Sequence, residues 1–438
     1  MAAKLRIIRN PADGPSGDDA GGPGIVPLHR LEEELINRLD TAAEQGAIAA
    51  VDAALLHAVH YRASDVHLEP WDDCLALRYR IDGILHDIAR IPRPHQARVI
   101  ARIKILARIV VYQRDVPQDG RIEQEATPCR VPMRASTFPT VNGEKIVIRI
   151  PTAHDEMLAL DALGFRPGVA DALRRFCRRP QGTLLLTGPS SSGKTTTIYA
   201  LLHEIMAGRD SAPHVVTIED PVERRLPQVA QTEINPHAGF TFEAALRSLL
   251  RQDPEVIMVG EIRDVDTART AIQAGLTGHL VISTIHSGTA AGVFTRLIDM
   301  GVEPFLVASS ITGVLAQRLV RTTCPACAAP DTPDPDLCAQ FGVVDGPHRF
   351  QRGAGCDACQ GIGYLGRTAL GELLSVNEEI AELILTRPRT SALHEAALRN
   401  HMTPLVEDGL ERALDGTTTL EELNRVVPRA AWQEGASS

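Results

Sequence analysis

The sequence Gly188-Pro189-Ser190-Ser191-Ser192-Gly193-Lys194-Thr195 fits the pattern G-x-x-x-x-G-K-[ST] of a phosphate-binding loop. The glycines let the backbone curl so that several N–H groups point at one phosphate. Lys194 offers a positive charge to the terminal phosphates, and the Thr195 hydroxyl can take one position on Mg²⁺. An apolar run over 183–187 precedes the loop and a helical pattern follows it, so the helix dipole also favours an anion there. We expect residues 188–196, which include Thr196, to bind a nucleotide.

Strand-like and helix-like stretches alternate from this loop onward. We expect strands at 183–187, 215–218, 256–259 and 280–285, and helices at 195–206, 242–251 and 266–274. Thr241 is expected to cap the second of these helices. Strands separated by helices predict a parallel sheet with helices on both faces. The fold class is therefore α/β.

Acidic and histidine side chains follow the strands next to this loop. Glu261 stands after the run 256–259, where an Asp that orders Mg²⁺ is usual. Glu219 ends the preceding strand and is the candidate to orient the attacking water, because neighbouring parallel strands end at the same edge. His286 follows the last strand and is placed to contact the γ-phosphate. For His279 a structural and a functional role remain equally open.

Two C-x-x-C pairs, Cys324 with Cys327 and Cys356 with Cys359, predict a metal site. Four thiolates complete a tetrahedral shell that suits Zn²⁺ and leaves no open position, so the site would be structural. The alternatives are four unrelated thiols or a redox pair.

The chain before the loop consists of segments with different sequence patterns. Residues 1–27 show no apolar periodicity and predict a flexible tail. Apolar spacing over 28–60 predicts two helices divided at Gly46. Residues 61–152 mix strand-like alternation with an amphipathic helix over 98–111, which predicts a small α+β domain. Residues 158–438 would form the nucleotide-binding domain, with a zinc subdomain over 322–362.

The composition is that of a globular chain. With 438 residues, two or three domains are expected, and 44% hydrophobic with 23% charged residues excludes a fibrous or wholly disordered protein. Apolar runs stay too short for a membrane span, and no secretory signal is expected at the N-terminus. A net charge of −10 and 4% aromatics disfavour nucleic-acid binding. The basic segment 78–114 is either a solvated face or a surface that meets phosphate.

Together the motifs resemble a known family, the secretion ATPases of type II secretion and type IV pilus assembly. The phosphate loop and the two C-x-x-C pairs belong to this resemblance. The other stretches that carry it are 64–70 (SDVHLEP), 80–83 (RIDG), 117–121 (PQDGR), 134–140 (RASTFPT), 143–145 (GEK), 219–223, 261–264 (EIRD), 279–286 and 416–420 (GTTTL).

The resemblance implies a RecA-like ATPase core preceded by a PAS-like domain, using ATP, Mg²⁺ and Zn²⁺. It implies a homohexameric ring on the cytoplasmic face of a bacterial inner membrane. There ATP hydrolysis would move the N-terminal domain and drive pseudopilin or pilin assembly through a membrane platform. Thr195 and Glu261 would hold magnesium, and Arg121 and Arg134 match arginines that reach a nucleotide across domains or subunits. A nucleic-acid motor on the same core and a non-hydrolysing scaffold are the alternatives.

The resemblance departs from many family members at the N-terminus. Only 63 residues precede Ser64, so the additional domain that docks many members on a membrane partner is not expected here. The four cysteines favour the export and assembly branch, because the pilus-retraction relatives generally lack them.

Overall fold

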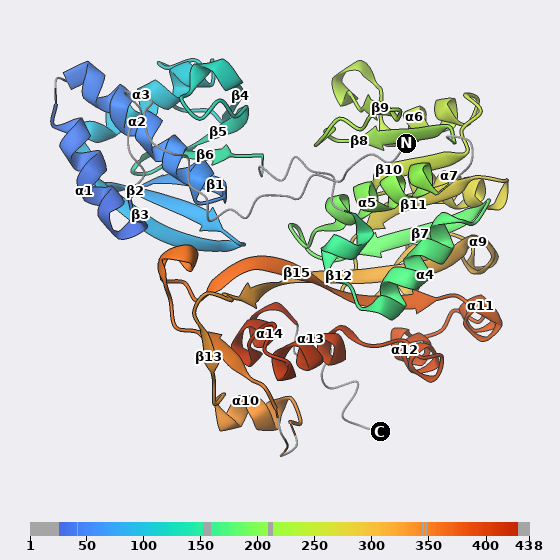
Figure 1. Ribbon diagram of the computed structural model, residues 1–438. Helices are drawn as coiled ribbons and strands as arrows, with labels where there is room; N and C mark the ends of the chain where they lie inside the picture. Colours follow the sequence, from blue (N-terminus) through green and yellow to red (C-terminus); the bar gives the residue numbers. More distant parts are fainter. Residues whose placement is uncertain are drawn as a thin grey trace, which may run out of the picture. The chain divides into compact units, whose positions relative to one another are not determined.

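The computed structural model describes residues 26–41, 43–151, 159–208, 213–343, 346 and 348–427 (Figure 1). The chain forms two compact units that divide near residue 153. Apart from 26 and 27, the predicted tail lies outside the described residues.

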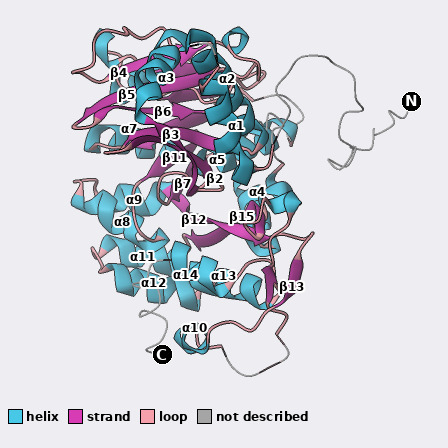
Figure 2. Ribbon diagram, turned by 90° about the vertical axis from the view of Figure 1, so that its left-hand side faces the viewer, coloured by secondary structure: helices cyan, strands magenta, loops and turns pink. Residues whose placement is uncertain are grey.

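The N-terminal unit is a six-stranded antiparallel sheet with three helices packed on one face (Figures 1 and 2). The strand order is β3-β2-β1-β6-β5-β4. The helices are α1 (Leu28–Leu39), α2 (Ala43–His60) and α3 (Arg93–Leu106). The strands are β1 (Ala63–Pro70), β2 (Cys74–Ile81), β3 (Ile84–Pro92), β4 (Gln118–Ile122), β5 (Met133–Thr140) and β6 (Gly143–Arg149). The predicted α+β class is confirmed, but the helices over 28–60, expected as a separate segment, pack in the same core as the sheet.

Alternation along the strands explains why one face of this sheet is covered. In β1, Val66 and Leu68 are buried in the core with the helices, whereas the alternating residues His67 and Glu69 are only partly buried and lie on the other face. The same period places Ala135 of β5 and Ile146 of β6 in the core. The burial of apolar side chains on one face stabilises this unit.

Three sequence expectations for this unit are wrong in detail. The break between the first two helices falls at residues 40–42, and Gly46 lies inside α2. A Cβ at Gly46 would come within 2.6 Å of the carbonyl oxygen of Arg38, so this glycine lets α2 approach the end of α1. Helix α3 begins and ends about five residues earlier than expected, with Pro94 in its first turn. Strands β3 and β4 are not predicted.

The second unit contains a seven-stranded sheet of order β15-β12-β7-β11-β10-β8-β9. All neighbouring pairs are parallel except β12 with β15. The strands are β7 (Gly182–Thr187), β8 (Val215–Glu219), β9 (Ala230–Glu233), β10 (Val256–Ile262), β11 (Leu280–Ile285), β12 (Ile311–Thr323) and β15 (Tyr364–Ser375). A small separate sheet pairs β13 (Ala328–Pro330) with β14 (Gln351–Gly353). The predicted parallel sheet is confirmed.

Helices cover both faces of this sheet, as the alternating pattern predicts. Leu184 and Leu186 pack in the core with α4 (Pro167–Cys177) and α5 (Lys194–Ala207), whereas Leu185 packs on the opposite side. That side holds α6 (Phe242–Leu249), α7 (Val265–Leu276), α8 (Ala290–Asp299) and α9 (Pro304–Ser310). Thr241 caps α6 as expected, since its hydroxyl accepts a bond from the Ala244 N–H.

Of the remaining helices, one lies between the two C-x-x-C pairs and the other four follow β15. They are α10 (Pro335–Gln340), α11 (Glu378–Leu385), α12 (Thr390–Arg399), α13 (Leu405–Leu414) and α14 (Leu420–Val426). Helix α13 packs on β15 and α14 on β12 (Figure 1). Among the described residues, every helix is too short or too polar to cross a membrane.

Candidate active site and metal centre

The phosphate loop connects β7 directly to α5. Strand β7 is buried along its whole length, and α5 begins at Lys194. Three residues of the loop have positive φ, namely Gly188 (+147°), Ser191 (+61°) and Gly193 (+86°). Such conformations curl the backbone and turn successive N–H groups toward one side, which is what an anion needs. The sequence therefore forms the predicted loop in the predicted context.

Lys194 lies across this loop. Its Nζ donates to the carbonyl oxygens of Gly188 and Pro189, both at 2.8 Å. Burial lowers the pKa of Lys194, and the nearby carboxylate of Glu261 acts in the opposite direction. The ammonium is thus held among acceptors at the mouth of the loop and close to Glu261.

The structure brings Glu261 and His286 together. Glu261 lies in β10 and His286 directly follows β11, and these two strands are parallel neighbours. One Glu261 oxygen lies 2.9 Å from His286 Nε2, and the other accepts from Arg263 Nε at 2.8 Å. A carboxylate, an imidazole and a lysine ammonium therefore lie near the carboxyl edge of the sheet, where ligands of parallel sheets bind.

Glu219 ends β8 and is almost fully buried. Its carboxylate accepts from the hydroxyls of Tyr199 and Thr217, both at 2.5 Å, and from Gln231 Nε2 at 3.0 Å. Burial and this carboxylate raise the pKa of Tyr199. Because Tyr199 belongs to α5, Glu219 is connected to the helix that begins at Lys194. Its predicted role toward water stays a prediction.

His279 lies at the opposite, amino end of β11. Its carbonyl oxygen accepts from the Gly182 N–H at the start of β7, and its Nδ1 lies 3.0 Å from the Ala274 carbonyl oxygen. This position, remote from the phosphate loop along the strand, favours the structural role that the sequence left open.

Arginines form a row on the polar face of the N-terminal unit. Arg121 of β4 lies opposite Arg134 of β5, and Arg134 lies opposite Arg149 of β6. The row ends at Asp65 of β1, whose oxygen is 3.4 Å from Arg149 Nε. Like charges directly opposite one another destabilise a sheet, so this row has an electrostatic cost within the unit. The sequence analysis missed Arg149, because strand register is not visible in the sequence.

Two further residues at the loop were missed, Gln317 and Arg318 of β12. Arg318 is buried and donates to the carbonyl oxygens of Gln317 and Gly288. Burial lowers the pKa of Arg318, while Glu372 acts to raise it. Both residues lie more than a hundred positions from the loop and reach it only because β12 pairs with β7.

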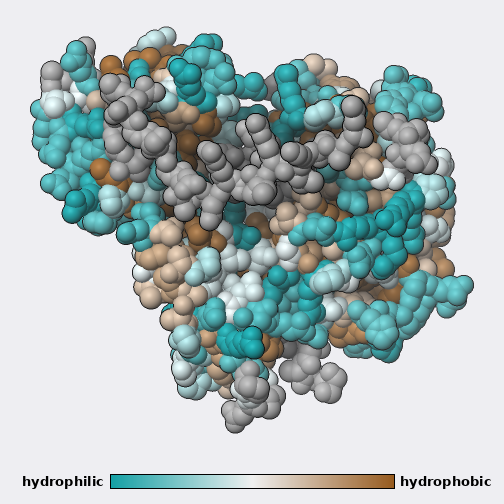
Figure 3. Space-filling model, in the orientation of Figure 1, coloured by the Kyte–Doolittle hydropathy of each residue, from teal (hydrophilic) through white to brown (hydrophobic). Residues whose placement is uncertain are grey.

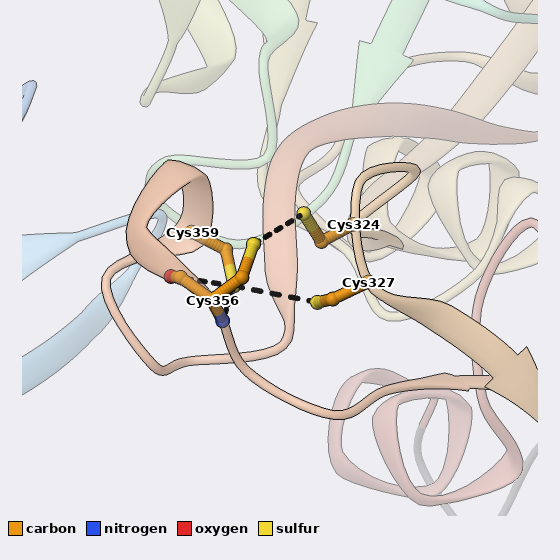
Figure 4. A group of neighbouring side chains, drawn as sticks. All are labelled: Cys324, Cys327, Cys356 and Cys359. Carbon is orange, nitrogen blue, oxygen red and sulfur yellow. Dashed lines mark hydrogen bonds between the residues drawn. The ribbon is translucent and has the colours of Figure 1, made fainter.

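The four predicted cysteines lie together (Figure 4). All four sulfurs are within 4.8 Å of one another, with separations of 3.9 Å for Cys324–Cys356 and 3.7 Å for both Cys327–Cys359 and Cys356–Cys359. A tetrahedral Zn²⁺ with Zn–S bonds of ~2.3 Å requires sulfurs about 3.8 Å apart. The sulfurs are too far apart for disulfide bonds, and all four thiols are free. The donor set and its spacing fit zinc.

The surroundings of Cys359 favour a thiolate. Burial acts to raise the pKa of this thiol, but the N–H groups of Cys356 and Gly363 donate to its sulfur and lower the pKa to about 7. Cys324 directly follows β12, and the second pair precedes β15. A metal here would therefore fasten the ends of the only antiparallel pair in the large sheet of the described chain.

We expect purified protein to carry about one zinc per chain. Changing Cys327 to Ser should abolish this zinc and lower the melting temperature, because three thiolates no longer close the shell. Cys338→Ser is the matched control, since Cys338 lies in α10 outside the cluster. Elemental analysis and thiol titration check this. Metal-free wild-type protein with four freely titrating thiols would refute the zinc site.

A strand of the parallel sheet leads into this loop and helix, and an acid and a histidine lie at the same edge of the sheet. This arrangement defines a P-loop nucleotide-binding protein. A family model described as "Type II/IV secretion system protein" matches residues 40–425, and the chain belongs to that family. The sequence resemblance to secretion ATPases is confirmed.

Several curated proteins are similar over most of this chain. The type II secretion system protein HxcR of Pseudomonas aeruginosa is 42% identical over 92% of this chain and 82% of its own length. The type II secretion system ATPase E of Vibrio cholerae is 42% identical over 91% and 79%. The type IV pilus assembly ATPase PilB of Thermus thermophilus is also 42% identical, over 90% of this chain but 44% of its own length.

Solved structures agree with the fold. The pilus retraction motor PilT with bound ADP superposes with a TM-score of 0.57 at 25% identity, covering 85% of this chain and 96% of PilT. The ATPase DotB of Yersinia pseudotuberculosis gives a TM-score of 0.63 at 20% identity, covering 89% and 94%, and supports the fold alone.

Proposed function

We propose that this protein hydrolyses ATP and that hydrolysis powers pseudopilus or pilus assembly and the export of proteins across a bacterial envelope. The observation that carries this is the phosphate loop with Lys194 beside the Glu261–His286 pair, in a chain of the secretion family. The relatives described above are named for secretion and pilus assembly, which does not favour a nucleic-acid motor.

The loop residues would bind the phosphates of ATP. Backbone N–H groups within 188–196 would donate hydrogen bonds to the phosphates, and the helix dipole of α5 would favour their negative charge. Lys194 adds a full positive charge. The Thr195 hydroxyl and Glu261 would hold Mg²⁺. The ion would neutralise charge that develops on the transferring phosphoryl group. The 2.9 Å contact with Glu261 would hold the exposed imidazole of His286 at the edge of the sheet where the terminal phosphate is proposed to bind.

Glu219 is proposed to act on the water that attacks the phosphate. Its bonds to Tyr199, Thr217 and Gln231 hold the carboxylate in one orientation. Glu261 is the next candidate for this role. Arg121 and Arg134 are proposed to stabilise the phosphoryl charge from the small domain, which couples closure of that domain to ATP.

A ring of six chains, associated with an inner-membrane platform, is the proposed working assembly. Exposed apolar side chains in the N-terminal unit support an assembly that covers them: Ile105, Tyr112 and Val141 are 59%, 88% and 101% exposed. Of these three, Val141 lines a cavity of roughly 460 Å³ bounded by α3, the following loop and the β5–β6 turn. Figure 3 shows brown apolar areas interrupting the hydrophilic surface of this unit. Large exposed apolar patches mark interaction surfaces.

Deleting the gene tests the proposal. The deletion strain should lose secreted proteins or surface pili, and a plasmid copy of the wild-type gene should restore them. A copy carrying Lys194→Ala should not. Unchanged secretion and piliation, or strong stimulation of ATP turnover by DNA in the purified protein, would contradict the proposal.

A further inference from the structure

Gln317 lies in β12 beside the phosphate loop and is 1% exposed. Strand β12 runs parallel to β7, and their paired residues end at Ala316 and Thr187. Gln317 follows Ala316 in β12, and the loop begins at Gly188, the first residue after β7. The side chain therefore stands where the backbone leaves the sheet to form the loop.

The Gln317 amide makes one bond with each of its ends. Its Nε2 donates to the carbonyl oxygen of Ser192 in the loop at 2.9 Å. Its Oε1 accepts from the hydroxyl of Thr197 in α5, also at 2.9 Å. These two bonds use the different donor and acceptor ends of an amide, which fixes its orientation.

Both glycines of the loop motif pack against this one residue. A Cβ at Gly188 would come within 2.5 Å of the Gln317 carbonyl oxygen, and a Cβ at Gly193 within 2.8 Å of Gln317 Nε2. A Cβ atom essentially never comes within 3.0 Å of another heavy atom, so a side chain at either position would displace Gln317 or the loop. The glycines are thus required for close contact with β12 as well as for backbone conformation.

The bond to the Ser192 carbonyl oxygen determines the orientation of the peptide group between Ser192 and Gly193. In a planar trans peptide the C=O and the following N–H point in opposite directions. Since the Ser192 carbonyl points at Gln317, the Gly193 N–H points away from β12. We infer that Gln317 is a positioning residue that presets the Gly193 N–H for nucleotide phosphate. This inference rests on the proposed nucleotide-binding function of the loop.

Gln317→Met tests the inference, because Met has nearly the same shape and makes neither hydrogen bond. We expect the Kd for ADP and the KM for ATP each to rise about tenfold, and kcat to change less, since a freed peptide must be reoriented on binding. Binding of a fluorescent ADP, ATP turnover and thermal melting are measured on the full chain.

Thr197→Val is the matched control. It removes the hydroxyl that bonds Gln317 Oε1 but leaves the Ser192 bond. We expect ADP affinity within about threefold of wild type, since only a neutral side-chain bond is lost. Equal weakening in Thr197→Val and Gln317→Met would show that Gln317 merely packs α5, and it would overturn the inference.

Gln317→Glu adds a pH readout. Burial raises the pKa of such a carboxyl, whereas the nearby cations Lys194 and Arg318 act to lower it, and only its protonated form can donate to the Ser192 carbonyl. ADP affinity of this variant should therefore recover as pH falls through that pKa and decline above it, relative to wild type. Wild-type affinity in Gln317→Met, or a pH-independent Gln317→Glu, would refute the inference. Failure of wild-type protein to bind ADP would instead refute the proposed function.

Discussion

Replacing Lys194 with Ala is expected to lower ATP turnover by at least about 10²–10³-fold, the effect of removing one donor aimed at developing charge. The lysine supplies the compact positive charge of the phosphate loop. Among the described residues, it donates to the backbone oxygens of Gly188 and Pro189 and to no other element. The substitution should therefore leave the fold intact.

Phosphate release and thermal melting measure these two effects separately. Arg399→Ala is a suitable control, because Arg399 is an exposed cation that pairs with Glu379 and lies about two hundred residues after the phosphate loop in the sequence. It should change neither turnover nor nucleotide affinity. Near-wild-type turnover in a folded Lys194→Ala protein would mean that this loop does not hold the reacting phosphates.

Replacing Arg134 with Ala is expected to lower turnover by roughly 10³–10⁵-fold, the range of arginine fingers, while nucleotide affinity changes far less. The loop alone leaves charge on the transferring phosphoryl group partly uncompensated, and an arginine from the small domain would compensate it. Arg121 should behave in the same way. Activity should also rise with oligomerisation if the arginine acts across subunits.

The position of Arg134 makes this result interpretable. It is exposed between Arg121 and Arg149, so its removal relieves like-charge repulsion and should not destabilise the sheet. Arg130→Ala serves as control, since Arg130 is an exposed cation just before the same strand. Full activity in an Arg121→Ala/Arg134→Ala double variant, or in a dilute monomer, would show that these arginines only occupy a surface.

Much of the nucleotide-binding unit could be predicted because its signals are local. The loop motif depends on glycine conformation and one lysine within eight positions, and the buried strands read as short apolar runs. Two C-x-x-C pairs sufficed to predict the cysteine cluster, because thiolate spacing within each pair is set by a single turn. The N-cap at Thr241 is equally local.

Predictions were weaker where the chain folds back on itself. Glycine usually weakens helices, so the sequence predicts a helix break at Gly46, yet this residue lies inside α2 where another backbone approaches. The sequence also left the role of His279 open, because its contacts were not visible. The structure shows that its Nδ1 lies 3.0 Å from the Ala274 carbonyl oxygen, at the amino end of β11, which favours a structural role.

By itself, the sequence determined the phosphate loop, the α/β alternation and the cysteine ligand set, because each arises from residues within a few positions of one another. Tertiary structure alone decided the arginine row, the Glu261–His286 contact and the hydrogen bond between Gln317 and the loop. These depend on strand order and register, which follow from the packing of whole elements. Gln317 and the loop, more than a hundred positions apart, come together because β12 pairs with β7.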